Sequence, residues 1–356
     1  MAANLAEKEN ISDLDFQWSW RSERGLDFNN NDLNVLEGLQ PQKNLKALKI
    51  KNFAGESLPT GIFVENLVEI LLYECIGCET LPMLGQLSKL ELLHIRNLDS
   101  VKSIGDEFYG SNYDSERTSL FPKLKTLHIS QMKSLEHWNE IGSVSNGASF
   151  PHLESLSITC CWKLVNIPNL FQEGLACIRN LKRLKVHGEL QGLDWSPFMH
   201  LNSSLENLEL VEMGVSSLLP QVPRQLEHLT ALKSLQIVGS NGVESLPDWL
   251  GNLTSLETSN LYRCRNLKSL PSKEAMSNLT RLNHLLVSGC SQLQLGEGSF
   301  EREKVSHVPD VNIEDETTNM FLSRVICCRL NFLYIASDHD LLLLAIAFVV
   351  VDGYSK

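Results

Sequence analysis

Apolar residues recur along the chain in the pattern L-x-x-L-x-L, as in Leu45, Leu48 and Ile50. Any residue can stand at x, and another apolar side chain can replace a leucine. The first residues of the copies are Ile11, Leu45, Leu67, Leu90, Leu124, Leu153, Leu181, Leu205, Leu232, Leu256 and Leu282. From Leu45 onward the spacing averages about 26 residues, within the 20–29 residues of leucine-rich repeats. One copy is degenerate, because Ser259 stands where the others have an apolar residue.

The alternation inside each copy predicts a short strand. In x-L-x-L-x the two apolar residues point to one side and the three others point to the opposite side. Stacked copies then pair as parallel strands and bury together the leucines that no single copy can bury. We therefore predict an α/β fold, a leucine-rich-repeat solenoid or horseshoe of about 10–11 repeats. The parallel β-sheet forms its concave face, and irregular or short helical segments form its convex side.

The repeat pattern divides the chain into three parts. Residues 1–44 are predicted to be an N-terminal capping segment with a first, degenerate repeat, and residues 45–296 are predicted to be the leucine-rich-repeat domain. Residues 297–356 lie outside the pattern and are predicted to be an acidic linker and an apolar tail. The longest apolar run of that tail, Leu341–Val351, has 11 residues. About 20 are needed to span a bilayer, so no membrane span is expected.

Cys75 and Cys78 form a Cys-x-x-Cys, a spacing that can indicate a metal or redox site. In the repeat, however, Cys75 occupies the ninth position, where leucine-rich repeats carry an inward-facing Asn or Cys. The same position holds Cys161, Cys264 and Cys290. Cys78 aligns with Leu267, so it fills apolar space. We interpret both residues as buried packing residues, with the Cys75 S–H bonding a backbone carbonyl, and we expect no metal and no cofactor.

Composition narrows the possible partners. The 356 residues are 43% hydrophobic, which is ample for a core, and the formal net charge is −12. Such a surface repels a phosphate backbone or an anionic membrane, so neither nucleic acid nor membrane is an expected partner. The N-terminal stretch lacks the basic start and apolar run of a secretory signal, which predicts a cytoplasmic or nucleo-cytoplasmic protein.

The sequence offers no candidate catalytic residues. It contains no P-loop, no dinucleotide-binding fingerprint, no nucleophile elbow and no H-E-x-x-H. His94 and His128 fall at the same outward strand position in neighbouring repeats, close enough to touch. A zinc site would need a third ligand there, and the adjacent Leu71 and Ser157 are poor ones. We therefore predict a protein that is not an enzyme.

The outward strand positions are the predicted partner-binding site. Basic and aromatic side chains stand there, on a chain that is acidic overall, and such residues are typical of protein interfaces. The candidates are Lys49, Lys51, Leu71, Tyr73, His94, Arg96, His128, Arg183, Lys185, His187 and Tyr262. The N-terminal half of this face is predicted to be basic. The alternative is that these are ordinary surface residues, covered by their neighbours or by a tail.

Several stretches resemble one family more closely than leucine-rich repeats at large. They are "VLEGLQP" (35–41), "LPMLGQLSKLELLHIRNLDSVKSIGDEFYG" (81–110), "FPKLKTLHISQMKSLEHW" (121–138) and "CWKLVNIP" (161–168). They are similar to the repeats of plant coiled-coil nucleotide-binding leucine-rich-repeat (NLR) disease resistance proteins of the RGA-like kind. The resemblance implies recognition of a pathogen effector or a guarded host protein, and autoinhibition of a nucleotide-binding domain. This sequence contains neither the coiled coil nor the nucleotide-binding module, so it implies no nucleotide switch here.

Two other functions remain open at this stage. A leucine-rich-repeat substrate receptor of a ubiquitin ligase would need an N-terminal F-box, but residues 1–44 already contain the strand pattern "ISDLDFQW". An extracellular receptor ectodomain would need an export signal and paired capping cysteines. The N-x-[ST] sequons at Asn202, Asn252 and Asn278 are interpreted as accidental.

Overall fold

The computed structural model describes residues 5–8, 10–19, 30–110, 119–139, 148–167, 180–188, 193, 195–212 and 222–314. The chain divides into two units, Met1–Thr317 and Thr318–Lys356, and all of the described residues belong to the first. The apolar tail that the sequence predicts lies outside the described residues.

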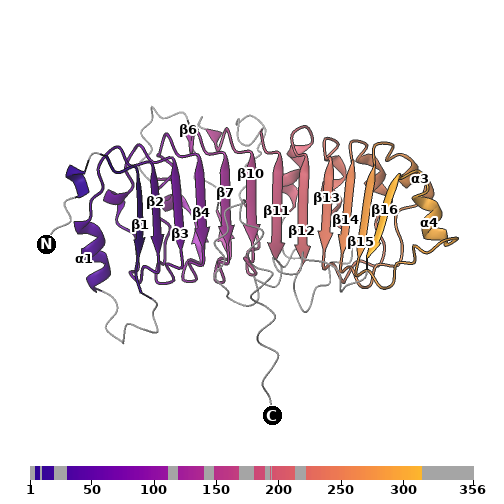
Figure 1. The fold of residues 1–356 in the computed structure, drawn as a ribbon, viewed down its shortest axis with the longest axis horizontal. Coiled ribbons are helices and arrows are strands. Elements are labelled where there is room, and N and C mark those ends of the chain that lie inside the picture. The colour runs from indigo at the N-terminus through magenta and orange to yellow at the C-terminus, as the bar shows by residue number, and fades with distance from the viewer. Residues whose placement is uncertain are drawn as a thin grey trace, which may run out of the picture. The chain divides into compact units, whose positions relative to one another are not determined.

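A parallel sheet of 12 strands runs through the first unit (Figure 1). The strands lie side by side in chain order, each paired with the strand of the next repeat. They are β1 (Asp13–Gln17), β2 (Ala47–Lys51), β3 (Glu69–Tyr73), β4 (Leu92–Arg96), β7 (Thr126–Ser130), β10 (Ser155–Thr159), β11 (Arg183–Gly188), β12 (Asn207–Glu212), β13 (Ser234–Val238), β14 (Thr258–Tyr262), β15 (His284–Ser288) and β16 (Asp310–Glu314). An open parallel sheet in this order, with few helices, confirms the predicted leucine-rich-repeat solenoid.

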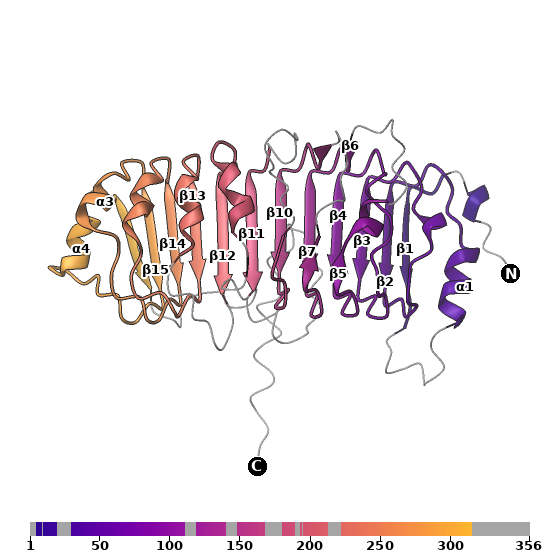
Figure 2. The same ribbon diagram turned by 180° about the vertical axis from the view of Figure 1, so that it is seen from behind.

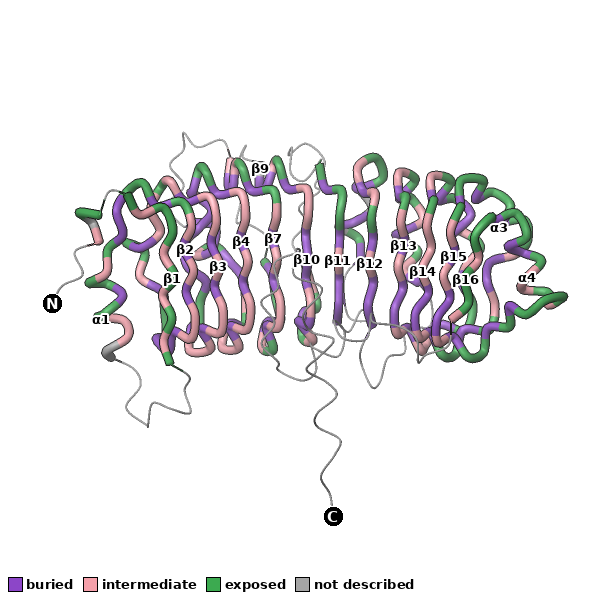
Figure 3. The backbone as a smooth tube through the Cα atoms, viewed as in Figure 1, coloured by how far each residue is buried: buried purple, intermediate pink, exposed green. Residues whose placement is uncertain are grey.

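The pairing register keeps the apolar columns of the sequence aligned. Leu48 pairs with Ile70, and Ile50 pairs with Leu72. In the N-terminal strands the two inward positions are buried and the three outward positions are half-buried, an alternation that Figure 3 shows along the tube. The inward residues of all repeats form one continuous apolar core, because each copy is covered by its two neighbours.

Short elements return the chain from one strand to the next behind the sheet (Figure 2). Two pairs of short parallel strands, β5 with β8 and β6 with β9, lie in the middle repeats. Their bounds are β5 (Ser103–Ile104), β8 (His137–Trp138), β6 (Ser119–Leu120) and β9 (Ala148–Ser149). The helical elements are η1 (Leu5–Glu7), α1 (Asn30–Gly38), η3 (Thr60–Ile62), α2 (Asp106–Tyr109), η5 (Ser196–Leu201), η6 (Arg224–His228), η7 (Asp248–Asn252), α3 (Lys273–Ser277) and α4 (Phe300–Lys304).

A residue in the left-handed backbone region follows many of the strands directly. Asn52, Glu74 and Asn97 have φ of 58°, 58° and 57°, and they come directly after β2, β3 and β4. Glycine, which adopts this conformation without steric cost, holds the equivalent position after β13 and β15. The chain therefore turns out of the sheet in the same way in successive repeats.

The four ninth-position cysteines are buried, as predicted. The Cys75 thiol lies 3.5 Å from the Tyr73 carbonyl oxygen and 3.9 Å from the Ile50 carbonyl oxygen of the preceding repeat. The thiols of Cys161, Cys264 and Cys290 have equivalent pairs of carbonyl partners. The Cys78 thiol donates to the Gly55 carbonyl over 3.4 Å. The Cys-x-x-Cys is therefore a pair of packing residues whose thiols satisfy backbone carbonyls between repeats.

The block "IGDEFYG" forms α2 and an aromatic cluster behind the sheet. Phe108 and Tyr109 pack against Phe121, with ring centroids 4.9 and 6.2 Å away. The Trp138 Nε1–H donates to the Tyr109 hydroxyl over 2.7 Å, so the one polar atom of each ring is satisfied inside the core. Gly85 lies under this segment, because a Cβ there would come within 2.4 Å of the Tyr109 carbonyl oxygen.

The sheet continues beyond residue 296, where the sequence pattern predicted a linker. α4 and β16 follow, and β16 pairs in parallel with β15. Val308, Val311 and Ile313 repeat the apolar spacing of the earlier copies. The sequence conceals this repeat because acidic residues, Asp310 and Glu314, stand at its outward positions.

A buried ion pair fastens α4 to the preceding repeat. Lys304 is only 7% exposed, and its Nζ lies 2.8 Å from Glu301 Oε1 and 3.1 Å from the Leu270 carbonyl oxygen. Glu301 Oε2 in turn accepts a hydrogen bond from the Leu270 backbone N–H over 2.7 Å. Both charged side chains thus meet the backbone of Leu270 in the preceding repeat.

Candidate functional site

The three outward residues of each strand form three parallel rows across the sheet, and we call this surface the strand face. The first, middle and third rows contain the first, third and fifth residues of each strand, as in Ala47, Lys49 and Lys51 of β2. All eleven candidate residues lie on the strand face, since every one of them occupies an outward register position. They fall in two groups, one over β2–β7 and the other over β11–β14.

The first group is centred on three rings. The Tyr73 hydroxyl lies 3.0 Å from His94 Nδ1, and the two rings meet edge to face with centroids 5.0 Å apart. His94 also meets His128 edge to face, with a centroid distance of 5.1 Å. The predicted contact between the two histidines is therefore confirmed. The rings of Tyr73, from the third row, and of His94 and His128, from the middle row, contact one another in series. We call these three residues the aromatic ledge.

Two rings of the aromatic ledge, those of Tyr73 and His94, are held in their neutral forms. Burial raises the pKa of Tyr73 to about 12, against an opposing effect of Arg96. Burial lowers the pKa of His94 to about 3, and the nearby His128 and Arg96 lower it further. At neutral pH both rings are uncharged, so this part of the strand face offers an amphipathic surface rather than a charged one.

The charges around the ledge are more balanced than the sequence suggests. Lys49 Nζ lies 3.1 Å from Asp15 Oδ2 of β1, which neutralises it. Lys51 has its pKa lowered by burial and by the adjacent Lys49. Burial raises the pKa of Glu74, whereas Arg96 and Lys51 oppose that rise. The N-terminal half is therefore not uniformly basic, because Asp15 and Glu74 stand among its cations.

Arg96 is oriented at the edge of the ledge. Its Nε donates to Gln131 Oε1, on the next repeat, over 3.1 Å. This bond fixes the guanidinium beside Tyr73, on the adjacent strand in register with it. Leu71, in the middle row beside His94, extends the apolar part of the surface.

The second group is built around a carboxylate that the sequence reasoning did not select. Glu209 of β12 lies 2.9 Å from both Lys185 Nζ and His187 Nε2 of β11. Burial alone would raise the pKa of Glu209, but the His187 hydrogen bond and the Lys185 charge lower it below its usual range. The His187 pKa is lowered by burial, against the effect of Glu209. The strand register could have identified Glu209 from the sequence, because it places Glu209 beside Lys185 in the middle row.

The third row differs between the two halves of the strand face. Tyr73 and Arg96 are half-buried, whereas Val211 is 0% exposed and Tyr262 is 8% exposed. His187 is also buried. Arg183, in the first row, is exposed and lies apart from the aromatic ledge. The structure thus groups the candidates of β2–β7 into one accessible surface, but buries His187 and Tyr262.

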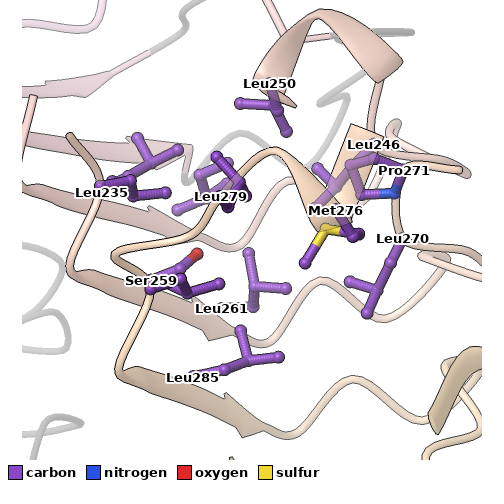
Figure 4. Close-up of a pocket in the computed structure, with 13 residues that line it drawn as sticks. Leu235, Leu246, Leu250, Ser259, Leu261, Leu270, Pro271, Met276, Leu279 and Leu285 are labelled. Atoms are coloured by element: carbon purple, nitrogen blue, oxygen red, sulfur yellow. The ribbon is translucent and has the colours of Figure 1, made fainter. Parts of the chain in front are cut away.

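A small cavity lies inside the core at the degenerate repeat (Figure 4). It is lined by leucines of neighbouring repeats, among them Leu235, Leu261 and Leu285, and by Ser259. Its volume of about 20 Å³ suits roughly one water molecule. The cavity marks the missing leucine rather than a ligand site.

Within the described ranges, no group of three His, Cys, Asp or Glu residues could hold a metal ion. The same part of the chain has no helix long and apolar enough to cross a membrane.

Comparisons with known proteins show which families this chain resembles. A family model described as R13L1/DRL21 LRRs matches residues 1–98 and 215–290. Putative disease resistance RPP13-like protein 1 of Arabidopsis thaliana is 28% identical over 288 residues, which are 77% of this chain and 26% of that protein. Putative disease resistance protein RGA4 of Solanum bulbocastanum is 30% identical over 238 residues, 66% of this chain and 22% of that protein. This chain therefore spans about a quarter of the length of these relatives.

Among solved structures, the leucine-rich-repeat protein LIC12759 of Leptospira interrogans is similar at 17% identity and a TM-score of 0.34, over 79% of this chain and 74% of that one. At this score the likeness carries no argument about function.

Proposed function

On the premise that this chain belongs to the family of leucine-rich-repeat regions found in plant disease resistance proteins, we propose a function in plant innate immunity. The chain recognises other proteins through its strand face. The proposed target is a pathogen effector or a host protein guarded against one. In a longer receptor, the same repeats would also hold a nucleotide-binding domain inactive. The proposed place of action is the cytoplasm.

The observation that carries the proposal is the aromatic ledge. Tyr73, His94 and His128 lie ring against ring, with the Arg96 guanidinium fixed beside them. Tyr and Arg are enriched among the few residues that carry most of the binding energy in protein interfaces. Aromatic rings also bury a large apolar area. The rings are already ordered by their contacts with one another, so little further order is lost when a partner covers them.

The decisive test uses substitutions on the ledge. Tyr73→Ala and Arg96→Glu are introduced separately in the full chain, and wild type is screened by two-hybrid assay against a library of secreted effectors and host proteins. Binders are then retested on each variant by biolayer interferometry. Loss of a central interface residue costs about 2 kcal/mol or more, so binding should weaken at least about 30-fold.

Arg281→Glu is the matched control, because it makes the same charge change at an exposed residue outside the three rows. It should leave binding within about twofold of wild type, as expected of a surface residue outside the interface. Circular dichroism of each variant verifies that the repeats remain folded. If every recovered binder were indifferent to both ledge substitutions, recognition through this surface would be wrong.

A further inference from the structure

Two neighbouring side-chain amides on the strand face each have one buried atom without a hydrogen-bond partner. Gln236 of β13 and Asn260 of β14 pair in register in the middle row. Both side chains are half-buried, and Gln236 Nε2 and Asn260 Oδ1 have no hydrogen-bond partner in the structure. Buried polar atoms without a partner are rare in native proteins, since each costs about 1–3 kcal/mol. The pair is therefore a feature that needs a physical reason.

Other polar side chains on the strand face bond one another, and the further unpaired atoms there, Ser130 Oγ and His187 Nδ1, have no unpaired neighbour in register. Glu209, next to Gln236 in the middle row, accepts from both Lys185 and His187. At the sheet's end, His284 Nδ1 lies 2.7 Å from Asp310 Oδ2. The contrast matters because it separates groups that already bond one another from groups whose bonding capacity is still free.

The two unpaired atoms are one donor and one acceptor. Gln236 Nε2 can only donate, and Asn260 Oδ1 can only accept. The two side chains project from neighbouring strands, which lie about 4.8 Å apart. The complementary group has an acceptor and a donor on the same side. A residue of an extended polypeptide fits this description, because its own C=O and N–H point to the same side.

The surroundings favour a main chain over a charged ligand. On one side of the pair, the Glu209 charge is neutralised by Lys185, and His187 lies within hydrogen-bonding distance of it. On the other, Leu286 of β15 is a half-buried apolar neighbour of Asn260. No uncompensated charge adjoins the two amides in the middle row, and Leu286 gives an apolar side chain a place to pack.

We propose that the middle row over β13 and β14 binds an extended segment of a partner polypeptide through its main chain. Gln236 donates to a carbonyl of the segment, and Asn260 accepts from an N–H of the same residue. The side chain of an adjacent residue packs on Leu286. The proposal rests on the proposed function, since it specifies what kind of polypeptide the strand face recognises and where.

The test uses a phage-displayed library of linear dodecapeptides, selected on the full wild-type chain. Enriched peptides are synthesised with a fluorophore, and their Kd values are measured by fluorescence anisotropy. Gln236→Glu replaces the donor with an acceptor at constant size, so binding should weaken by about tenfold or more. Asn260→Asp keeps the accepting oxygen, so binding should stay within about threefold of wild type.

The peptide itself supplies a second readout. Methylating one backbone nitrogen at a time removes one N–H while leaving the side chains in place. A single position should abolish binding, namely the residue whose N–H donates to Asn260. A purely structural role of the two amides would produce neither this positional pattern nor the difference between the two variants.

Two results would overturn the inference: no dodecapeptide enriched on wild type, or enriched peptides that bind Gln236→Glu as tightly as wild type. Arg96→Glu separates this failure from that of the proposed function. Protein binders sensitive to Arg96→Glu but not to Gln236→Glu would keep the aromatic ledge as the recognition surface and reject the main-chain site. Binders insensitive to both would reject the two together.

Discussion

His94 is a histidine that the folded chain keeps neutral. It packs between Tyr73 and His128 near Arg96, and burial lowers its pKa to about 3. The unfolded chain has a histidine pKa of about 6.5. Between these two values the unfolded state binds a proton that the native state excludes. The stability tied to neutral His94 is therefore fully present above pH 6.5 and is lost as the pH falls towards 3.

This predicts that the unfolding free energy depends on pH differently in wild type and in His94→Gln, because a glutamine side chain cannot titrate. From pH 7 to pH 5, the unfolding free energy of wild type should fall by about 1–2 kcal/mol more than that of the variant. Urea titrations at both pH values, followed by circular dichroism, measure the two differences. Parallel losses in the two proteins would show that His94 titrates normally in the folded state.

Ser259 illustrates how one residue leaves a mark on the core. Its register neighbours are Leu235 and Leu285, and a cavity of about 20 Å³ lies among them. Filling the cavity with apolar atoms should stabilise the repeat, because each buried methylene contributes about 0.8 kcal/mol. We predict that Ser259→Val raises the unfolding free energy by about 1 kcal/mol.

Ser259→Ala is the matched control for that substitution. It removes the hydroxyl without filling the cavity, so the difference between the two variants isolates the packing contribution. The urea midpoints of wild type, Ser259→Val and Ser259→Ala measure this difference in stability. Equal midpoints for Ala and Val would mean that the cavity is not available to an added side chain.

At the scale of the elements, charged residues placed just before the strands alternate in sign along the sheet. Lys125 pairs with Glu91 at 2.7 Å, Lys182 with Glu154 at 3.5 Å, and Lys233 with Glu206 at 3.3 Å. A strand that paired one repeat out of place would bring like charges together. The ladder therefore adds specificity to a register that the leucine columns alone leave degenerate.

Lys182→Glu tests this ladder, since it places three carboxylates in succession. Exposed pairs contribute about 0.2–1 kcal/mol each, so the variant should lose about 1 kcal/mol of unfolding free energy at low salt. The loss should largely disappear in 1 M NaCl, because the Debye length falls to about 3 Å. Denaturation at the two ionic strengths measures it, with Lys182→Ala as the control for side-chain removal. A loss that persisted in high salt would indicate packing instead of charge.

The strands were the most predictable elements, and the reason is physical. Alternation fixes which side chains face inward, and stacking fixes the register, so Leu48 could be matched with Ile70 from the sequence. The elements behind the sheet were less predictable, because their form depends on local packing, as in the aromatic cluster of α2. The strand β16 was missed because its outward Asp310 and Glu314 resemble a linker.

The sequence predicted on which face the candidate residues lie, but not which side chains contact one another or how exposed each one is. Every candidate occupies the outward position that the sequence assigned, as with His94 beside His128. The sequence could not show that Glu209 binds Lys185 and His187, because side-chain rotamers decide which neighbours meet. Burial of Tyr262 was equally hidden, because the register assigns a side chain to a face but does not determine how much of it is exposed.

At the scale of the molecule, each repeat contacts only its neighbours, so stability should be local. The Lys304–Glu301 pair and its contacts with the Leu270 backbone fasten the last described repeat to the one before it. Removing one partner of a buried pair costs about 3–5 kcal/mol. We predict that Lys304→Ala loosens residues 300–314 while leaving the remaining repeats folded.

Hydrogen–deuterium exchange measures this directly. Amides of β15 and β16 should exchange faster in Lys304→Ala, whereas those of β3 and β4 should exchange at wild-type rates. Lys268→Ala is the comparison, because its pair with Glu244 is exposed and should matter little. Uniform acceleration across the whole sheet would mean that the repeats unfold as one cooperative block.

The alternation of inward and outward side chains along the N-terminal strands has a consequence for how such a protein can change over time. The inward side chains build the core, whereas the outward side chains of the N-terminal strands are only half-buried. A mutation at an exposed outward position, such as Arg183, should therefore change the surface at little cost in stability. Under the proposed function, such substitutions would change the partners that are bound while the fold stays the same.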